Sequence, residues 1–247
     1  MRTWRFVDLV ERPELRAVAD EVVGDNLPDF MSWESPGNWR WHRIHGLFPR
    51  YQVCAVDDYG RFAGVLNAVP VRWSGAVAEL PAGYDGVLTS VVDGDGAVGA
   101  RHTCLLSISV VAGHRRSGLA EALLADARGR AAERGHDGIL APVRPTAKHR
   151  YPLIPIADYA AWLTEDGEAF DPWLRVHLNA GAAFLGVAER SMVVRQPVER
   201  WEAFTGTAMP GPGGYPVPGA LTPVHRAADG FATYAEPNIW VLHPTRR

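Results

Sequence analysis

The spacing of apolar residues in the first third of the chain predicts a strand, a helix and a hairpin. Residues 4–9 are apolar enough for a short strand, and residues 15–23 repeat apolar groups at helical spacing. Tryptophans alternate with proline and glycine in residues 27–48, which predicts helical segments broken by loops. Residues 51–57 and 61–73 are rich in valine and alanine and are separated by a turn sequence, so we predict an antiparallel hairpin.

A strand, a loop and a long amphipathic helix come next. Residues 74–99 are rich in glycine and are predicted to form a loop, whereas residues 102–111 show a clear strand pattern. We predict a helix over residues 118–134, with Ser117 as its N-cap. Residues 139–143 return as a strand, which completes a βαβ unit.

The C-terminal part of the chain changes in composition. A helix is predicted over residues 171–179 and a strand over residues 191–195. Residues 209–223 are rich in proline and glycine, which predicts an ordered or mobile connector rather than a second domain. We therefore expect one domain over residues 1–200 and a Pro/Gly-rich extension over residues 201–247 that packs on the same domain.

Composition narrows the class of protein. Hydrophobic residues make up 47% and charged residues 21% of the chain, which is typical of a packed globular protein. The net charge of −3 lacks the basic excess of a nucleic-acid binder. The N-terminus has no apolar segment of signal-peptide length, and the longest near-apolar stretch, residues 105–113, is too short to cross a membrane. We expect a cytoplasmic protein that does not bind nucleic acid or membranes.

Neither a disulfide framework nor a metal site is expected. The two cysteines, Cys54 and Cys104, lack the spacing of a structural zinc site and are too few for a network of disulfides. His42 and His45 are three residues apart, but no third ligand lies near them in the sequence. We therefore predict a protein without a bound metal.

The loop between the strand over residues 102–111 and the helix after it has the chemistry of an anion site. Small residues turn the chain at Gly113, and the main-chain N–H groups that open the helix have no partner within it. Gly118 permits close approach of a ligand, and Arg115 and Arg116 add positive charge. The alternative is an ordinary helix start with solvated arginines. The dinucleotide-binding and P-loop glycine motifs are both absent.

Residues Arg115 to Ala120 fit the Q/R-x-x-G-x-G/A signature of the GNAT (Gcn5-related) N-acetyltransferases, in the same context of strand, loop and long helix. The resemblance implies a mixed, mostly antiparallel twisted sheet of six to seven strands, with a splayed central pair and flanking helices. It implies acetyl-CoA or another acyl-CoA as co-substrate, with the loop around the diphosphate and the preceding strand along pantetheine. The resemblance places the family's cofactor-binding positions in this sequence at Ser109, Val110, Val111, Arg115, Arg116, Ser117, Gly118, Leu119 and Ala120.

The resemblance also suggests candidates for catalysis. The main-chain N–H of Val110 is the candidate that polarises the thioester carbonyl. His177 stands where the family commonly has a tyrosine general acid, and its alternative is a histidine with a satisfied ring. Cys104 stands where Gcn5-type members have a glutamate base, and it is more simply a small buried residue sharing a strand face with Leu106 and Ile108. The other candidates for the base are His102, Asp158 and Glu236, or a chain of water molecules that leads to a carboxylate elsewhere, and the base stays unassigned.

Acceptor binding is expected from aromatic residues and from a basic loop. The candidates are Trp33, Trp41, Arg144, Lys148, His149 and Tyr151. The leading hypothesis is transfer of an acyl group from CoA to a primary amine of a small molecule by direct attack in a ternary complex. Two alternatives stay open: a non-catalytic acyl-CoA sensor, and an acyltransferase whose donor is an acyl carrier protein docked on the basic loop. We expect a monomer or a homodimer.

Overall fold

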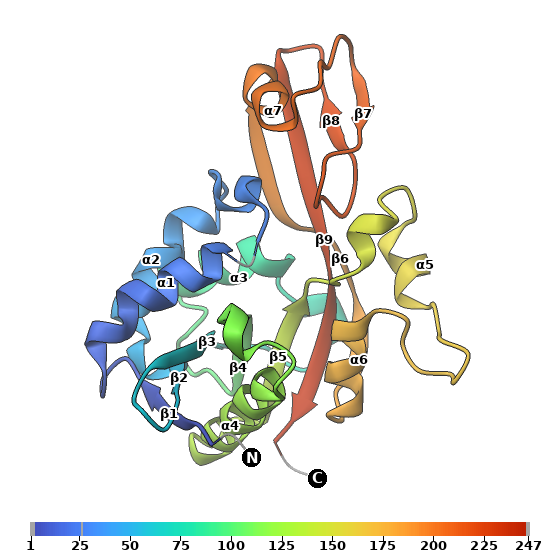
Figure 1. The fold of residues 1–247 in the computed structure, drawn as a ribbon. Coiled ribbons are helices and arrows are strands. Elements are labelled where there is room, and N and C mark those ends of the chain that lie inside the picture. The colour runs from blue at the N-terminus through green and yellow to red at the C-terminus, as the bar shows by residue number, and fades with distance from the viewer. Residues whose placement is uncertain (1–2, 26, 246–247) are drawn as a thin grey trace.

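A mixed β-sheet forms the centre of the computed structural model, which describes residues 3–25 and 27–245 (Figure 1). The strands are β1 (Arg5–Asp8), β2 (Gln52–Val56), β3 (Phe62–Val71), β4 (His102–Val110), β5 (Gly138–Val143), β6 (Ala183–Pro197), β7 (Gly213–Tyr215), β8 (Val224–Arg226) and β9 (Phe231–Pro244). Their order is β1-β2-β3-β4-β5-β9-β8-β7, with β6 also paired to β9. All of these pairs are antiparallel except β4 with β5, so the predicted fold class is confirmed.

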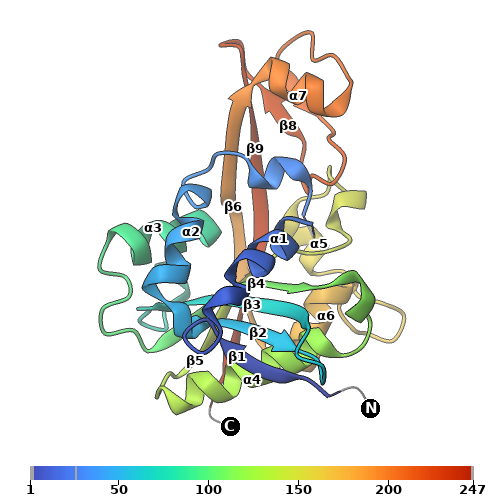
Figure 2. The same ribbon diagram turned by 60° about the vertical axis from the view of Figure 1, so that its left-hand side comes forward.

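Helices cover both faces of the sheet (Figure 2). They are α1 (Arg16–Asp25), α2 (Asn38–Leu47), α3 (Gly83–Asp93), α4 (Leu119–Glu133), α5 (Ile156–Ala160), α6 (Pro172–Asn179) and α7 (Val198–Thr205). Apolar residues of α1, α2 and α3 pack on one face, which we call the α1–α3 face. Apolar residues of α4, α5 and α6 pack on the opposite face. Side chains on neighbouring positions of one strand therefore meet different sets of helices.

Several local predictions agree with the structure. The hairpin is β2 with β3, and β4, α4 and β5 form the βαβ unit. The broken helical stretch consists of a 3-10 helix, Asp29–Ser32, followed by α2.

The prediction of a continuous loop over residues 74–99 is wrong. A short 3-10 helix, Val77–Glu79, precedes α3 in this stretch. Val87, Leu88, Val91 and Val92 of α3 are buried at helical spacing, because they pack on β3 and β4. Two of the glycines that suggested a loop stand at the ends of this helix: Gly83 opens it and Gly94 closes it. Burial of the apolar face outweighs their low helix propensity.

The C-terminal residues contribute a long strand to the main sheet. β9 pairs with β5 over residues 239–244 and with β6 over residues 231–242, so its middle lies between these two strands. β6 and β9 extend beyond the sheet as a ribbon that carries α7, β7 and β8 (Figure 1). The described residues thus form nine strands rather than six or seven. The division of the chain at residue 200 stays a prediction.

Candidate active site

The parallel strands β4 and β5 pair over only three positions. His102 faces Gly138, Thr103 faces Ile139, and Cys104 faces Leu140. Beyond this point β4 continues to Val110, yet no further residue of it pairs with β5 in the described structure. The edge of β4 from residue 105 to residue 110 is therefore not covered by the neighbouring strand, which is the splayed central pair that the family resemblance implies.

Main-chain donors of β4 point into this gap. The N–H of Val111 donates to Ala63 O, on the side of β3 (3.0 Å). Because N–H groups alternate in direction along a strand, those of Ile108 and Val110 point away from β3 and toward the space that β5 leaves. A β-bulge interrupts the register between Asn67 and Ala68 on β3, opposite Leu105 to Ser107 on β4. An extended ligand thus has an open strand edge to pair with.

The loop after β4 ends in an unusual main-chain conformation at the mouth of α4. Arg116 has φ +59° and Gly118 has φ +83°, so both lie in the left-handed region. Arg116 is the one residue other than glycine with a positive φ among those described. Gly118 is the N-cap of α4, so the predicted Ser117 cap is wrong: the Ser117 hydroxyl donates to His114 O instead. Left-handed residues of this kind occur in the main-chain turns that bind anions through successive N–H groups.

The surroundings of this loop suit a phosphate ligand. Arg115, Arg116 and Gly118 are exposed, Ser117 is half-buried, and Leu119 anchors the helix start in the core. A hollow of about 510 Å³ lies beside the first turn of α4 and is lined by Glu121 together with Pro172, Arg175, Val176, Asn179 and Ala180 of α6 and its end. The loop, the open edge of β4 and this hollow are neighbours on the side of α4 and α6.

His177 lies in a buried pair of histidines. Its Nδ1 is 2.8 Å from Nε2 of His243 on β9, and both side chains are almost fully buried. Burial, with a smaller contribution from His243, lowers the pKa of His177 to about 3. Burial likewise lowers the pKa of His243 to about 4. Near neutral pH both rings are uncharged, so His177 carries no readily released proton and we do not assign it the role of general acid.

Cys104 is enclosed by the core on the α1–α3 face. Its exposed fraction is 0%, and burial raises the pKa of its thiol. The bulge places Leu106 with Cys104 in this cluster, whereas Ile108 packs on the opposite face, so the predicted common face of all three is wrong. A buried neutral thiol is neither a base nor a nucleophile, and no catalytic role is assigned to Cys104.

Arg144 and Glu236 form a buried ion pair beyond the end of β5. Arg144 Nε donates to Glu236 Oε2 (2.9 Å), and the Arg144 guanidinium also donates to Gly219 O (2.8 Å). The same carboxylate accepts hydrogen bonds from Tyr234 Oη (2.9 Å) and Asn238 Nδ2 (3.3 Å). Three donors therefore fix this carboxylate, and Glu236 is better placed to orient Arg144 than to remove a proton.

This ion pair is tied to α3. Ser191 Oγ donates to Asn238 Oδ1 and accepts from the N–H of Tyr84 (2.8 Å). Such close contact requires glycine at position 83, because a Cβ there would lie 2.3 Å from Ser191 Cα. Tyr84 stacks on Trp41 of α2, with ring centroids 6.2 Å apart. Two of the predicted acceptor-binding residues, Trp41 and Arg144, are thus linked on the α1–α3 face. The link runs through Tyr84, Ser191, Asn238 and Glu236.

The other predicted acceptor-binding residues lie elsewhere. Lys148 is fully buried, and its ammonium group donates to Tyr151 O and Leu221 O (2.8 and 2.7 Å); burial lowers its pKa to about 8. His149 is exposed beside Thr146 O. Tyr151 is half-buried and packs edge-on against Trp162. Trp33 packs against Trp201 of α7, the helix that the ribbon of β6 and β9 carries. The structure therefore does not bring these four residues to the gap between β4 and β5.

The remaining candidates for a base are also away from the gap. His102 lies at the paired end of β4 and contacts Trp73, and Asp158 is exposed on α5. A polar contact that the sequence analysis missed does adjoin the gap: Asn67 Nδ2 on β3 donates to Ser107 Oγ on β4 (3.0 Å). Asn67 is buried in an otherwise apolar strand, and a polar residue in that position is the signal that would have revealed it.

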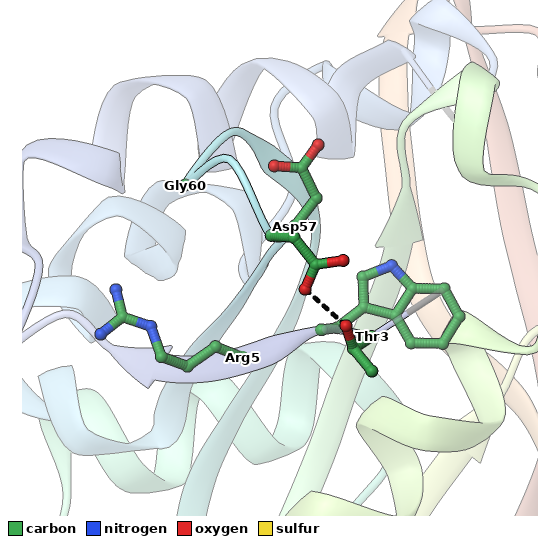
Figure 3. A pocket seen from close by; sticks show the side chains of 6 residues that line it. Thr3, Arg5, Asp57 and Gly60 are labelled. Atoms are coloured by element: carbon green, nitrogen blue, oxygen red, sulfur yellow. Dashed lines mark hydrogen bonds between the residues drawn. The ribbon is translucent and has the colours of Figure 1, made fainter. Parts of the chain in front are cut away.

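A separate hollow of about 410 Å³ lies at the β1 edge of the sheet, lined by Thr3, Trp4, Arg5, Asp57, Asp58 and Gly60 (Figure 3). The hydroxyl of Thr3 donates to Asp58, and Asp57 accepts from the N–H groups of Tyr59 and Arg61 (2.9 Å each). These carboxylates hold the turn between β2 and β3, and we assign no ligand to them. In the described part of the chain, no cluster of three metal-ligating side chains occurs and no helix has the length and apolarity needed to span a membrane.

Comparison with known proteins identifies the family to which the chain belongs. No family model matches the chain. The chain is 31% identical to the arginine N-acetyltransferase avaD of Aspergillus versicolor, over 88% of this chain and 84% of that protein. It belongs to the GNAT superfamily of N-acetyltransferases. The predicted enzyme class is thereby confirmed, and family membership makes an acyl-CoA the co-substrate.

Two solved structures share the fold over nearly the whole chain. The loading GNATL domain of CurA from Lyngbya majuscula has a TM-score of 0.63 at 14% identity, covering 100% of this chain and 98% of that domain. The GphF GNAT-like decarboxylase, solved with isobutyryl-CoA, has a TM-score of 0.56 at 15% identity, covering 99% of this chain and all of that one. At these identities the likeness is one of fold.

Proposed function

We propose that the protein transfers an acyl group, most simply acetyl, from CoA to a primary amine of a small molecule related to an amino acid. The observation that carries the proposal is the combination of an open β4 edge with left-handed turns at Arg116 and Gly118. The N–H groups at the start of α4 would hold the diphosphate, with Arg115 and Arg116 at the rim. Pantetheine would extend along β4 and pair with Ile108 and Val110.

Chemistry in this arrangement is a direct attack. The nitrogen of the neutral amine adds to the thioester carbonyl carbon, and the electrons of the C=O bond move to oxygen. When the carbonyl re-forms, the C–S bond breaks and sulfur leaves with its electron pair. The nitrogen loses one proton and the thiolate gains one, so CoA is released as the thiol. The main-chain N–H groups of Ile108 and Val110 are preorganised donors along the path of the carbonyl oxygen.

The α1–α3 face supports the acceptor side of the proposal. Arg144 is held by Glu236 and keeps 22% of its side chain exposed, so it is available to pair with an acceptor carboxylate. Trp41 stacks on Tyr84, and the main chain of Tyr84 is linked to Glu236 through Ser191 and Asn238. The relative in Aspergillus versicolor is an arginine N-acetyltransferase by name, which makes arginine and other amino acids the first acceptors to test.

An acyl carrier protein as the donor is less well supported than an acyl-CoA. Docking an acidic partner on residues 144–150 would need several exposed cations there, but Lys148 is buried and only 22% of the Arg144 side chain is exposed. Among the basic residues of this loop, only His149 and Arg150 are exposed. A free acyl-CoA therefore fits the surface better as donor than an acyl carrier protein does.

A release assay tests the proposal. The protein is mixed with acetyl-CoA and a panel of amino acids and polyamines, and free CoA thiol is measured together with the mass of the acceptor. The proposal predicts thermal stabilisation by acetyl-CoA and a gain of one acetyl group on an amine. Stabilisation without release on any acceptor would favour the sensor alternative, and no stabilisation at millimolar acetyl-CoA would contradict the proposed donor.

A further inference from the structure

Ser107 has a hydroxyl whose direction is set by its neighbour. Its Oγ accepts a hydrogen bond from Asn67 Nδ2 at 3.0 Å, and no other partner of that hydroxyl is found among the described residues. An oxygen that accepts from an amide is left with its own O–H free to donate elsewhere. Ser107 is half-buried on β4, beyond the last position that pairs with β5. The hydroxyl therefore lies on the stretch of β4 that β5 does not cover.

The place of Ser107 along β4 corresponds to the reacting end of the donor. If the diphosphate lies at residues 116–120, the pantetheine arm runs back along β4 toward the point where β5 departs, at Cys104 and Leu140. Ser107 is three residues deeper into the gap than Val110, or about 10 Å at 3.3 Å per residue. An arm that follows β4 therefore reaches Val110 first, and Ser107 lies further along it, toward the thioester.

Asn67 has a second polar neighbour besides Ser107. It is buried on β3, and its Oδ1 has no hydrogen-bond partner that meets normal geometry. The imidazole of His45 on α2 adjoins it, and Asp20 Oδ1 on α1 lies 3.5 Å from His45 Nδ1. An Asn67 amide turned the other way would place its NH₂ group toward the His45 ring and its oxygen toward Ser107, which would then donate to Asn67. The orientation of one amide therefore decides whether Ser107 offers a proton to the gap.

We propose that the hydroxyl of Ser107 donates a hydrogen bond to the carbonyl oxygen of the bound thioester, and that Asn67 is the positioning residue that directs it. The inference rests on the proposed use of an acyl-CoA donor. Ser107 loses no proton: its O–H shares charge with the carbonyl oxygen as the amine adds, and the bond relaxes when the C–S bond breaks. A side-chain donor thus supplements the main-chain N–H groups of β4 at the place where negative charge develops.

Infrared difference spectra of bound acetyl-CoA, labelled with carbon-13 at its carbonyl, test the inference without any acceptor. A hydrogen bond to the carbonyl lowers its stretching frequency. The band is expected to rise in Ser107→Ala and to return toward the wild-type frequency in Ser107→Thr. In Asn67→Asp the new carboxylate accepts the Ser107 proton, so the band should rise as in Ser107→Ala although the serine is present. The double variant should show no further rise.

Thr103→Ala is the matched control, because this hydroxyl stands on the same strand, in its paired stretch, and bonds to His136 Nδ1 (3.0 Å). Its band should equal that of the wild type. In the release assay, Ser107→Ala is expected to lower kcat about 10²-fold with little change in KM for acetyl-CoA. If the carbonyl band has the same frequency in the wild type and in Ser107→Ala, the inference is overturned and the donor assignment stands. If no band of bound acetyl-CoA is seen, the proposed function itself is overturned.

Discussion

Cys104 on β4 and Leu140 on β5 form the last pair that joins the two parallel strands. Both side chains are fully buried on the α1–α3 face, where they close the base of the gap. The features that we propose for binding the donor lie beyond this pair: the free edge of β4, the Ser107 hydroxyl and the mouth of α4. The position of one pair in the sheet thereby separates the structural part of β4 from the part that we propose contacts the ligand.

Gly118→Ala is expected to lower both stability and affinity for acetyl-CoA. No atom lies within 4 Å of a Cβ added there, so the cost comes from the left-handed φ of +83° and amounts to about 1 kcal/mol. Relaxation of the turn would misdirect the N–H groups that we propose as phosphate ligands. Calorimetric titration and thermal unfolding measure the two effects.

Gly129→Ala is the control, since Gly129 lies inside the same helix with open space around it and without a positive φ. It should raise stability by about 0.5–1 kcal/mol and leave affinity unchanged. Equal loss of affinity in both variants would show that the conformation of Gly118 has no part in binding.

Arg116→Gly separates backbone strain from charge. The left-handed φ of +59° costs a residue other than glycine about 1 kcal/mol, so the glycine variant should unfold at higher urea than Arg116→Ala. Both variants lose the same guanidinium and should bind acetyl-CoA with equally reduced affinity and a weaker dependence on salt. Affinity equal to wild type in both would remove Arg116 from the anion site.

The buried histidine pair predicts a defined sensitivity to acid. The pKa of His177 is lowered to about 3 and that of His243 to about 4, mainly by burial, against about 6.5 in the unfolded chain. Below pH 6.5 these two histidines bind protons in the unfolded chain but remain neutral in the folded protein. The free energy of unfolding should therefore fall as pH drops, by up to about 1.36 kcal/mol per pH unit for each histidine.

Urea unfolding between pH 7.5 and pH 5 checks this prediction. His177→Gln should lose part of the pH dependence, while His149→Gln, at an exposed position, should keep all of it. Because we assign His177 no proton transfer, its variant should retain turnover near neutral pH once it is folded. Loss of turnover in a stably folded His177→Gln would restore the general-acid role that the family resemblance suggested.

Removing one partner of the Arg144–Glu236 pair should affect stability and acceptor binding together. Glu236→Gln leaves a buried guanidinium without its carboxylate, and the loss for such a site is about 3 kcal/mol or more. Arg144→Met combined with Glu236→Leu removes both charges and should be less destabilised. Both variants should raise KM for the acceptor and leave KM for acetyl-CoA near the wild-type value; an unchanged acceptor KM would place the acceptor elsewhere.

The sequence predicted the parts of the fold that local pattern determines. The hairpin of β2 with β3 and the β4-α4-β5 unit follow from alternation and helical spacing, and the loop at Gly118 follows from its signature. α3 escaped prediction because Gly83 and Gly94 at its ends resembled loop residues. β9 was not predicted because Pro237 interrupts its strand pattern, although that strand lies beside β5. Packing on β3 and β4 determined α3, and long-range strand pairing determined β9.

The main-chain part of the candidate site could be predicted from the sequence. The side-chain contacts could not, because they depend on the register between strands. The N–H groups before α4 are a consequence of local sequence, whereas the pairing of His177 with His243 joins residues 66 positions apart. The contact of Asn67 with Ser107 needs the register of β3 and β4, including the bulge between them. Side chains that meet across a sheet become visible only when the strands are aligned.

A crystal structure of the protein with CoA tests the central claim most directly. The account predicts diphosphate oxygens within hydrogen-bonding distance of the N–H groups of residues 116–120, and pantetheine between β4 and β5 with its sulfur near Ser107. Diphosphate bound elsewhere, or a β4 edge covered by protein while CoA is bound, would contradict it.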